Sequence, residues 1–123
     1  MVSILVVDDN TDAAESLAEL LELIGAQTHV ATDGEAALSS AERLRPDIVL
    51  VDIGLPGIDG FDVARAIRAQ PWGGGMMLVA LTGWGRPEDH KRSEAAGFDH
   101  HLVKPVDVAV LEQVVAERAA TAG

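Results

Sequence analysis

The residues of this chain best suited to chemistry are five polar side chains that each follow a short apolar segment. They are Asp8, Asp9, Asp52, Thr82 and Lys104. Together they offer three carboxylates, one hydroxyl and one ammonium group. Phosphoryl transfer needs such groups, because its transition state spreads negative charge over three oxygens and catalysis is mainly positioning and neutralisation. The five residues therefore predict phosphoryl chemistry, provided that the fold brings them together.

Each of the five residues has a predicted role. Three carboxylates in one crevice repel one another, and a hard divalent cation that prefers oxygen ligands removes this repulsion. Asp8, Asp9 and Asp52 are therefore expected to hold Mg²⁺ or Mn²⁺. Asp52 would attack phosphorus and become an aspartyl phosphate. Thr82 would donate a hydrogen bond to one phosphoryl oxygen, and Lys104 would pair with another.

Short apolar runs alternate with helical patterns along the chain. The expected strands cover residues 4–7, 28–31, 48–51, 77–81 and 102–103. The expected helices cover residues 14–24, 33–44, 59–69, 87–96 and 110–115, with a loop at 55–57 and a flexible connection at 73–75. This alternation predicts one α/β domain over residues 1–123 with right-handed crossovers. The expected architecture is a doubly wound, flavodoxin-like, five-stranded parallel sheet of order 2-1-3-4-5, with helices on both faces.

The predicted sheet explains why the five residues should meet. Sites in such sheets form at the carboxyl ends of the strands, near the point where the strand order reverses. The first and third strands flank that point and end in Asp8 and Asp52. The fifth strand lies two strand spacings, roughly 10 Å, from the third. A long side chain such as that of Lys104 is needed to cover this gap.

Charge and composition exclude several classes of protein. The net charge is -11, with only 9 basic against 20 acidic residues, so neither nucleic acid nor an anionic membrane is an expected direct partner. The chain has no cysteine, which excludes disulfides and thiolate metal sites. The apolar run of residues 4–7 is too short for a signal peptide or a membrane span. A cytoplasmic location is therefore expected.

The chain resembles the receiver domains of two-component response regulators over essentially its whole length. The matching pieces are residues 7–10, 52–60, 80–83, 96–99 and 104–105. The resemblance implies that a sensor histidine kinase or a histidine phosphotransfer domain donates the phosphoryl group from a phosphohistidine. It also implies that the carbonyl of Gly54 joins the Mg²⁺ shell and that the Lys104-Pro105 peptide is cis. Residues 98–107 further resemble receivers that are fused to hybrid sensor kinases.

The same resemblance implies a switch. Phosphorylation would draw Thr82 inward and rearrange the face formed by the fourth helix, the fifth strand and the fifth helix, which would bind a downstream protein. The family usually has Tyr or Phe three residues before the lysine, and here His101 stands in that position. We predict that His101 moves between exposed and inward rotamers. Trp84, two residues after Thr82, is predicted to slow hydrolysis of the phosphoryl group.

Three alternative functions compete with a phosphoacceptor. A Mg²⁺-dependent aspartyl-phosphate phosphatase would typically need a second acid two residues after the nucleophile, where this chain has Gly54. A nucleotide or flavin module would place a glycine- or hydroxyl-rich loop after the first strand, where Asp8 and Asp9 would repel phosphate. A degenerate receiver that acts only in docking would not need all five residues. His29 and His90 are expected on the surface.

Overall fold

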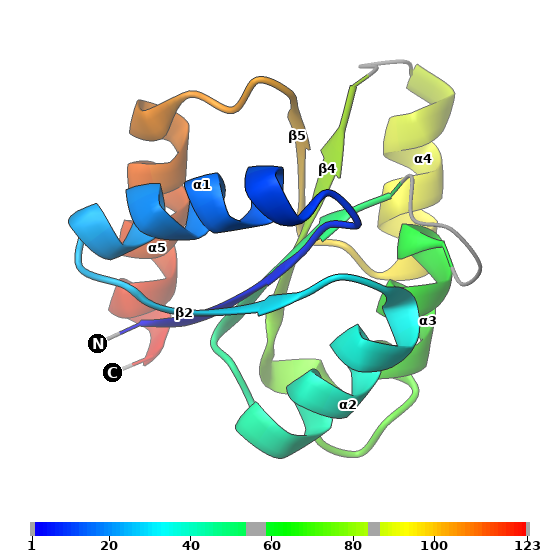
Figure 1. The fold of residues 1–123 in the computed structure, drawn as a ribbon. Coiled ribbons are helices and arrows are strands. Elements are labelled where there is room, and N and C mark those ends of the chain that lie inside the picture. The colour runs from blue at the N-terminus through cyan, green and yellow to red at the C-terminus, as the bar shows by residue number, and fades with distance from the viewer. Residues whose placement is uncertain (1, 54–58, 84–86, 123) are drawn as a thin grey trace.

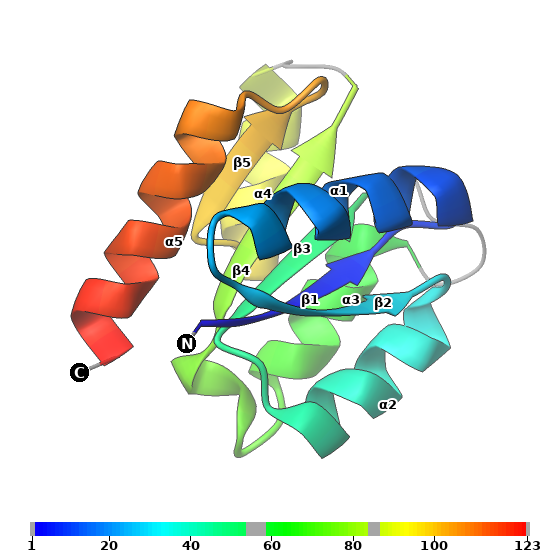
Figure 2. The ribbon, with the colours of Figure 1, turned by 60° about the vertical axis from the view of Figure 1, so that its left-hand side comes forward.

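The strands of the chain form one parallel sheet whose carboxyl ends lie at a common edge. The computed structural model describes residues 2–53, 59–83 and 87–122, so the loop expected at 55–57 lies outside the described residues. The strands are β1 (Ser3–Val7), β2 (Gln27–Ala31), β3 (Ile48–Asp52), β4 (Met77–Thr82) and β5 (His100–Val103). Their order is β2-β1-β3-β4-β5, and Figure 2 shows β3 and β4 between β1 and β5. The predicted fold class is confirmed.

Five α-helices cover the sheet in two layers. They are α1 (Thr11–Leu23), α2 (Gly34–Leu44), α3 (Gly60–Arg68), α4 (Pro87–Ala96) and α5 (Val108–Ala122). Figure 1 shows α1 and α5 on one side of the sheet and α2, α3 and α4 on the other. Among the described residues, no helix is both long enough and apolar enough to cross a membrane.

The central strands are buried on both faces, which is why their sequences are continuously apolar rather than alternating. Val49 and Val51 of β3 belong to a core cluster that includes Phe61 of α3. Ile48 and Leu50 of the same strand belong to a second cluster on the opposite face. Successive side chains of a strand point to opposite faces, so one apolar strand supplies both layers of the core.

Side-chain caps fix where three of the helices begin. Asn10, Asp33 and Asp59 each accept a hydrogen bond from the main-chain nitrogen three residues later, at 3.1, 2.7 and 2.9 Å. The first turn of a helix has N–H groups without helical partners, and such a side chain satisfies one of them. The caps predicted at Asp33 and Asp59 are thereby confirmed.

The connection between α3 and β4 differs from the prediction. Residues Gly73–Gly75 form a short 3-10 helix, η1, rather than an irregular linker. Gly73 is buried, and a β-carbon there would lie 1.7 Å from the carbonyl oxygen of Ile67. Glycine is therefore required at this position by close packing against α3, whereas Gly74 has open space around it.

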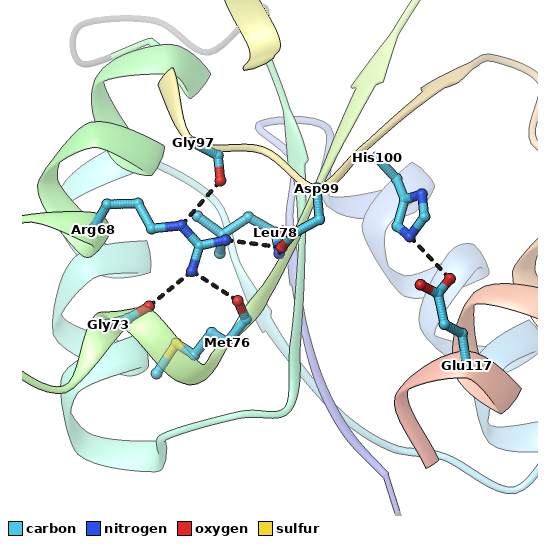
Figure 3. A network of polar contacts seen from close by, with 8 residues as sticks. All are labelled: Arg68, Gly73, Met76, Leu78, Gly97, Asp99, His100 and Glu117. Atoms are coloured by element: carbon cyan, nitrogen blue, oxygen red, sulfur yellow. Dashed lines mark hydrogen bonds and ion pairs between the residues drawn. The ribbon is translucent and has the colours of Figure 1, made fainter. Parts of the chain in front are cut away.

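The guanidinium group of Arg68 holds together the region where α3, η1, α4 and β5 meet (Figure 3). It donates to the carbonyl oxygens of Gly97, Gly73 and Met76 at 2.9, 2.9 and 2.8 Å. It also donates to the carboxylate of Asp99 at 2.8 Å. Arginine suits this role because its donors have a fixed planar arrangement. Since Gly97 directly follows α4, this network anchors the carboxyl end of that helix.

Candidate functional site

Three carboxylates gather at the carboxyl ends of β1 and β3. Asp8, Asp9 and Asp52 each offer one oxygen, and these three oxygens all lie within 4.8 Å of one another. The parallel pairing of β1 with β3 brings the strand ends together, with Val7 opposite Val51 in the register. Asp8 is buried, Asp52 is half-buried and Asp9 is exposed. The convergence predicted from the strand ends is confirmed.

The first carboxylate is held in place by its own loop. The main-chain nitrogen of Asp8 donates to the carbonyl oxygen of Ala31 at 3.1 Å. Its Oδ1 accepts a hydrogen bond from the main-chain nitrogen of Asn10 at 3.0 Å. Since Asn10 also caps α1, the start of that helix and the position of the Asp8 carboxylate are coupled.

Lys104 reaches across the sheet to the acidic group. Its Nζ lies 3.2 Å from Oδ2 of Asp8 and 3.2 Å from Oδ2 of Asp52. Burial lowers the pKa of the Lys104 ammonium group, but attraction to Asp52 and the hydrogen bonds to Asp8 and Asp52 together outweigh it, so that the pKa is raised above 10.5. Lys104 is thus a permanent positive charge at neutral pH. The Lys104-Pro105 peptide is cis, as the resemblance implied.

Thr82 is the last residue of β4, at the same edge of the sheet as these groups. It is buried, with 5% of its surface exposed, and its carbonyl oxygen accepts a hydrogen bond from the main-chain nitrogen of Lys104 at 2.7 Å. Asp52 pairs in the register with Leu81, the residue before Thr82. The strand ends that carry Asp52, Thr82 and Lys104 are therefore adjacent. The role predicted for the Thr82 hydroxyl stays a prediction.

The acidic group has the donor set of a site for a hard divalent cation. Mg²⁺ binds through one or two carboxylates and keeps several waters, and Mn²⁺ accepts the same oxygen ligands. Three carboxylate oxygens within 4.8 Å, one of them on an exposed residue open to solvent, fit that requirement. Gly54, whose carbonyl was predicted to complete the shell, and Trp84 lie outside the described residues.

Sequence reasoning assigned no role to Gly60, the first residue of α3. A β-carbon at this position would lie 2.5 Å from Cα of Ile53 and 3.0 Å from the carbonyl oxygen of Asp52. Glycine therefore lets α3 begin directly against the backbone that carries the Asp52 carboxylate. The signal in the sequence is a glycine immediately after the capping residue Asp59.

An apolar cavity opens beside the acidic group, between α1 and the segment after β5. Its volume is about 490 Å³. It is lined by Asp8, Ala13, Leu17, Leu20, Leu81, Lys104, Pro105 and Val106. Leu20 is more than a third exposed. The site is thus flanked by apolar surface that remains accessible to another molecule.

The two adjacent histidines of β5 point in opposite directions, as predicted for neighbours on a strand. Nε2 of His100 lies 3.0 Å from a carboxylate oxygen of Glu117 on α5. His101 pairs in the register with Ala80 and faces α4, where its Nδ1 lies 2.7 Å from Oγ of Ser93. The proposed movement of the His101 ring stays a prediction.

Comparison with known proteins gives a consistent family. The model described as "Response regulator receiver domain" matches residues 4–116. One relative is a 14.6 kDa protein of Leptolyngbya boryana. It is 38% identical to this chain over 114 residues, and the alignment covers 93% of this chain and 87% of that protein. The DNA-binding response regulator MtrA of Mycobacterium tuberculosis is 41% identical over 102 residues, 83% of this chain and 43% of MtrA. The chain therefore spans less than half the length of MtrA.

A solved structure with the same fold contains a metal ion. It is the receiver domain of the sensor histidine kinase PA1611 of Pseudomonas aeruginosa, with a magnesium ion coordinated in its active-site cleft. Its TM-score to this chain is 0.87 at 33% identity, and the alignment covers 96% of this chain and 97% of that one.

Proposed function

This chain belongs to the response regulator receiver domain family, and from that premise we propose that Asp52 is the residue that accepts the phosphoryl group. Receiver domains are the phosphoacceptor signalling domains of two-component systems. One observation carries the assignment to Asp52: its Oδ2 lies 3.2 Å from the Lys104 ammonium group, inside a group of three carboxylates. Asp52 is also half-buried at the end of β3.

The proposed reaction is transfer from a phosphohistidine to a carboxylate. An Asp52 oxygen attacks phosphorus, the P–N bond of the donor breaks, and its electron pair returns to the donor imidazole. Lys104 pairs with one phosphoryl oxygen, and the Thr82 hydroxyl donates to another. Asp8, Asp9 and Asp52, with the expected carbonyl of Gly54, would hold Mg²⁺ or Mn²⁺, which supplies neutralisation of the phosphoryl oxygens when bound.

The contacts of Lys104 support a preorganised site. The ammonium group is already held between Asp8 and Asp52 before any phosphate arrives. A charge placed where negative charge will develop needs little reorganisation during the reaction. The raised pKa of Lys104 keeps this charge in place throughout the physiological range.

Receiver domains interact with sensor histidine kinases, and the finer assignment of partners is part of this proposal. The donor would be the phosphohistidine domain of such a kinase or a histidine phosphotransfer domain. It would dock on the apolar surface beside Asp8 and Lys104. A downstream protein would bind the α4-β5-α5 face. Three statements stay predictions. They are that nucleic acid is not a direct partner, that the location is cytoplasmic, and that the chain is alternatively a module of a larger hybrid kinase.

The test is phosphorylation by a small donor. The chain is incubated with Mg²⁺ and acetyl phosphate, and its intact mass is measured. We expect the mass to rise by one phosphoryl group in the wild type, no rise in Asp52→Asn, and a normal rise in the control Asp62→Asn, which changes an exposed carboxylate of α3. Phosphorylation of Asp52→Asn to the wild-type extent would refute the assignment.

The same experiment separates the two remaining alternatives. A phosphatase would release phosphate continuously from the small donor, so steady-state phosphate release is measured in parallel. A degenerate receiver would gain no mass with Mg²⁺ or Mn²⁺ present. The proposal requires a stoichiometric gain of mass that depends on the metal and slow release of phosphate.

A further inference from the structure

The short turn that leads from β1 into α1 (Figure 2) contains two hydrogen bonds to side chains in succession. Oδ1 of Asp8 accepts a hydrogen bond from the main-chain nitrogen of Asn10 at 3.0 Å. Oδ1 of Asn10 accepts in turn from the main-chain nitrogen of Ala13 at 3.1 Å. The first contact is an Asx-turn, and the second is the amino-terminal cap of α1. Asn10 therefore connects a carboxylate of the acidic group to the helix that follows it.

The direction of the Asp8 carboxylate is set by its partners. The last torsion angle of an aspartate side chain has only broad preferences, so hydrogen bonds decide how the carboxylate is turned. Oδ1 is held by the nitrogen of Asn10, and Oδ2 lies 3.2 Å from Nζ of Lys104. Only 4% of Asp8 is exposed, so protein groups rather than bulk water determine its orientation. A carboxylate has about four lone-pair sites, so it can be held on both oxygens and still bind a cation.

The contact on Oδ1 depends on the direction of the Asn10 N–H group. Asn10 has an extended backbone, with φ -86° and ψ 104°. Two hydrogen bonds from α1 fix it there: its side chain accepts from Ala13, and its carbonyl oxygen accepts from the nitrogen of Ala14 at 3.0 Å. Without an acceptor in the side chain, the first turn of the helix loses a partner for one of its N–H groups and frays. The N–H of residue 10 would then no longer be held towards Asp8.

We propose that Asn10 is a positioning residue of the cation site: by capping α1, its side chain holds its own N–H group on Asp8 and keeps that carboxylate directed for a divalent cation. The inference rests on the proposed function, because it takes Asp8 as one of the ligands. Groups that orient metal ligands change metal affinity by about 10–100-fold when they are replaced. Here the donor is a main-chain group that survives substitution, so the effect is limited by the strength of the cap, which corresponds to about fivefold.

The coupling between the cap and the cation acts in both directions. If the cap strengthens the binding of a cation, the bound cation must stabilise the cap by the same factor. The capped helix also carries Leu17 and Leu20, which line the apolar cavity beside the acidic group. Occupation of the cation site would therefore order the start of the helix that forms one wall of the proposed docking surface.

Three substitutions separate this role from other effects of changing Asn10. Asn10→Ser keeps a capping oxygen but removes the amide. Asn10→Gln keeps the amide, but glutamine is not among the residues that cap helices well. Ala18→Gly weakens the interior of α1 by an amount comparable to the loss of a cap and leaves the cap itself in place. A direct role of the amide, a role of the cap and a general loss of helix stability thus give different results.

The first measurement is the affinity for Mg²⁺ by NMR titration, without any phosphodonor. We expect the dissociation constant to rise about fivefold in Asn10→Ala and Asn10→Gln, and to stay within about twofold of the wild type in Asn10→Ser and Ala18→Gly. Equal affinity of Asn10→Ala and the wild type would overturn the inference. Affinity in Asn10→Ser as weak as in Asn10→Ala would overturn it too, and so would an equal loss in Ala18→Gly.

The second measurement needs no metal. Amide hydrogen exchange at residue 10 is followed in EDTA and corrected for intrinsic rates. We expect protection of this amide to fall in Asn10→Ala and to be kept in Asn10→Ser, and unchanged protection in Asn10→Ala would overturn the inference. A wild type that binds no Mg²⁺ would overturn the cation site of the proposed function together with this inference. A wild type that binds Mg²⁺ no better than Asn10→Ala would overturn the inference alone.

Discussion

Replacing Asp52 by asparagine should stabilise the metal-free chain, although it abolishes the proposed function. The substitution keeps the shape of the side chain and removes one negative charge. In the absence of metal, the Asp52 carboxylate is repelled by Asp8 and Asp9 and attracted by Lys104. The sign of the effect depends on which of these interactions is larger.

The distances in the site decide the sign. Each repelling pair lies within 4.8 Å, which corresponds to at least about 3.5 kcal/mol at an effective dielectric constant of about 20. The attraction over 3.2 Å is about 5.2 kcal/mol under the same assumption. The two repulsions together exceed the attraction by about 1.8 kcal/mol, and this surplus falls to about 0.4 kcal/mol at the dielectric constant of water. We therefore expect Asp52→Asn to raise the free energy of unfolding by about 0.4–1.8 kcal/mol.

The assay is urea unfolding, with and without metal. In EDTA, Asp52→Asn should unfold at higher urea than the wild type with an unchanged slope. Adding Mg²⁺ at ten times its dissociation constant should raise the free energy of unfolding of the wild type by about 1.4 kcal/mol and that of the variant by less. Glu112→Gln removes one charge from an exposed position on α5 and controls for the net charge of -11.

One result would refute the reasoning. If Asp52→Asn is less stable than the wild type in EDTA, the attraction of Lys104 outweighs the repulsion among the carboxylates. The acidic group would then be balanced without metal, and the physical argument for a cation at this site would lose its basis. An equal gain in Glu112→Gln would instead assign the effect to net charge.

Three further predictions concern single residues. Lys104→Met should have a lower free energy of unfolding than the wild type at neutral pH. Because the pKa of Lys104 is raised above 10.5, the difference in stability should be fully present below pH 10.5 and should be lost as the pH rises through the raised pKa. Urea unfolding at a series of pH values measures this difference. Gly60→Ala should lose about 1–3 kcal/mol and accept phosphate more slowly in the mass assay, because its β-carbon has no room, whereas Gly74→Ala should change neither. Arg68→Met should lose about 2–4 kcal/mol of stability in thermal or urea unfolding, since several carbonyl oxygens lose their hydrogen-bond donor. The control Arg65→Met breaks one exposed ion pair at 3.3 Å and should lose less than about 1 kcal/mol. Equal losses in the two variants would contradict this account.

The parts of the molecule that follow from local pattern were predictable. The apolar runs before Asp8, Asp52 and Thr82 identify buried parallel strands, and the carboxyl ends of parallel strands must share one edge of the sheet. The caps at Asp33 and Asp59 follow from residue type and position alone. Since the site is built from strand ends, its composition could be predicted together with the fold.

The parts that depend on packing between distant segments were not predictable. A run of three glycines indicates flexibility by composition, and only the packing of Gly73 against Ile67 shows that glycine is required there. His90 was expected on the surface and is exposed, but its stacking on His101 depends on how α4 docks against β5. No periodicity in the sequence reports such a contact between two elements.

The anchorage of the carboxyl end of α4 by Arg68 gives that helix the geometry of a lever. Arg68 fixes the segment just after Ala96, and the helix extends from there for 10 residues, about 15 Å, towards the acidic edge of the sheet. A rotation of about 8° around the fixed end therefore displaces the far end by about 2 Å. Such a displacement of the far end needs little movement at the end that Arg68 holds. The domain can thus change the outline of one face while its core and its sheet keep their shape.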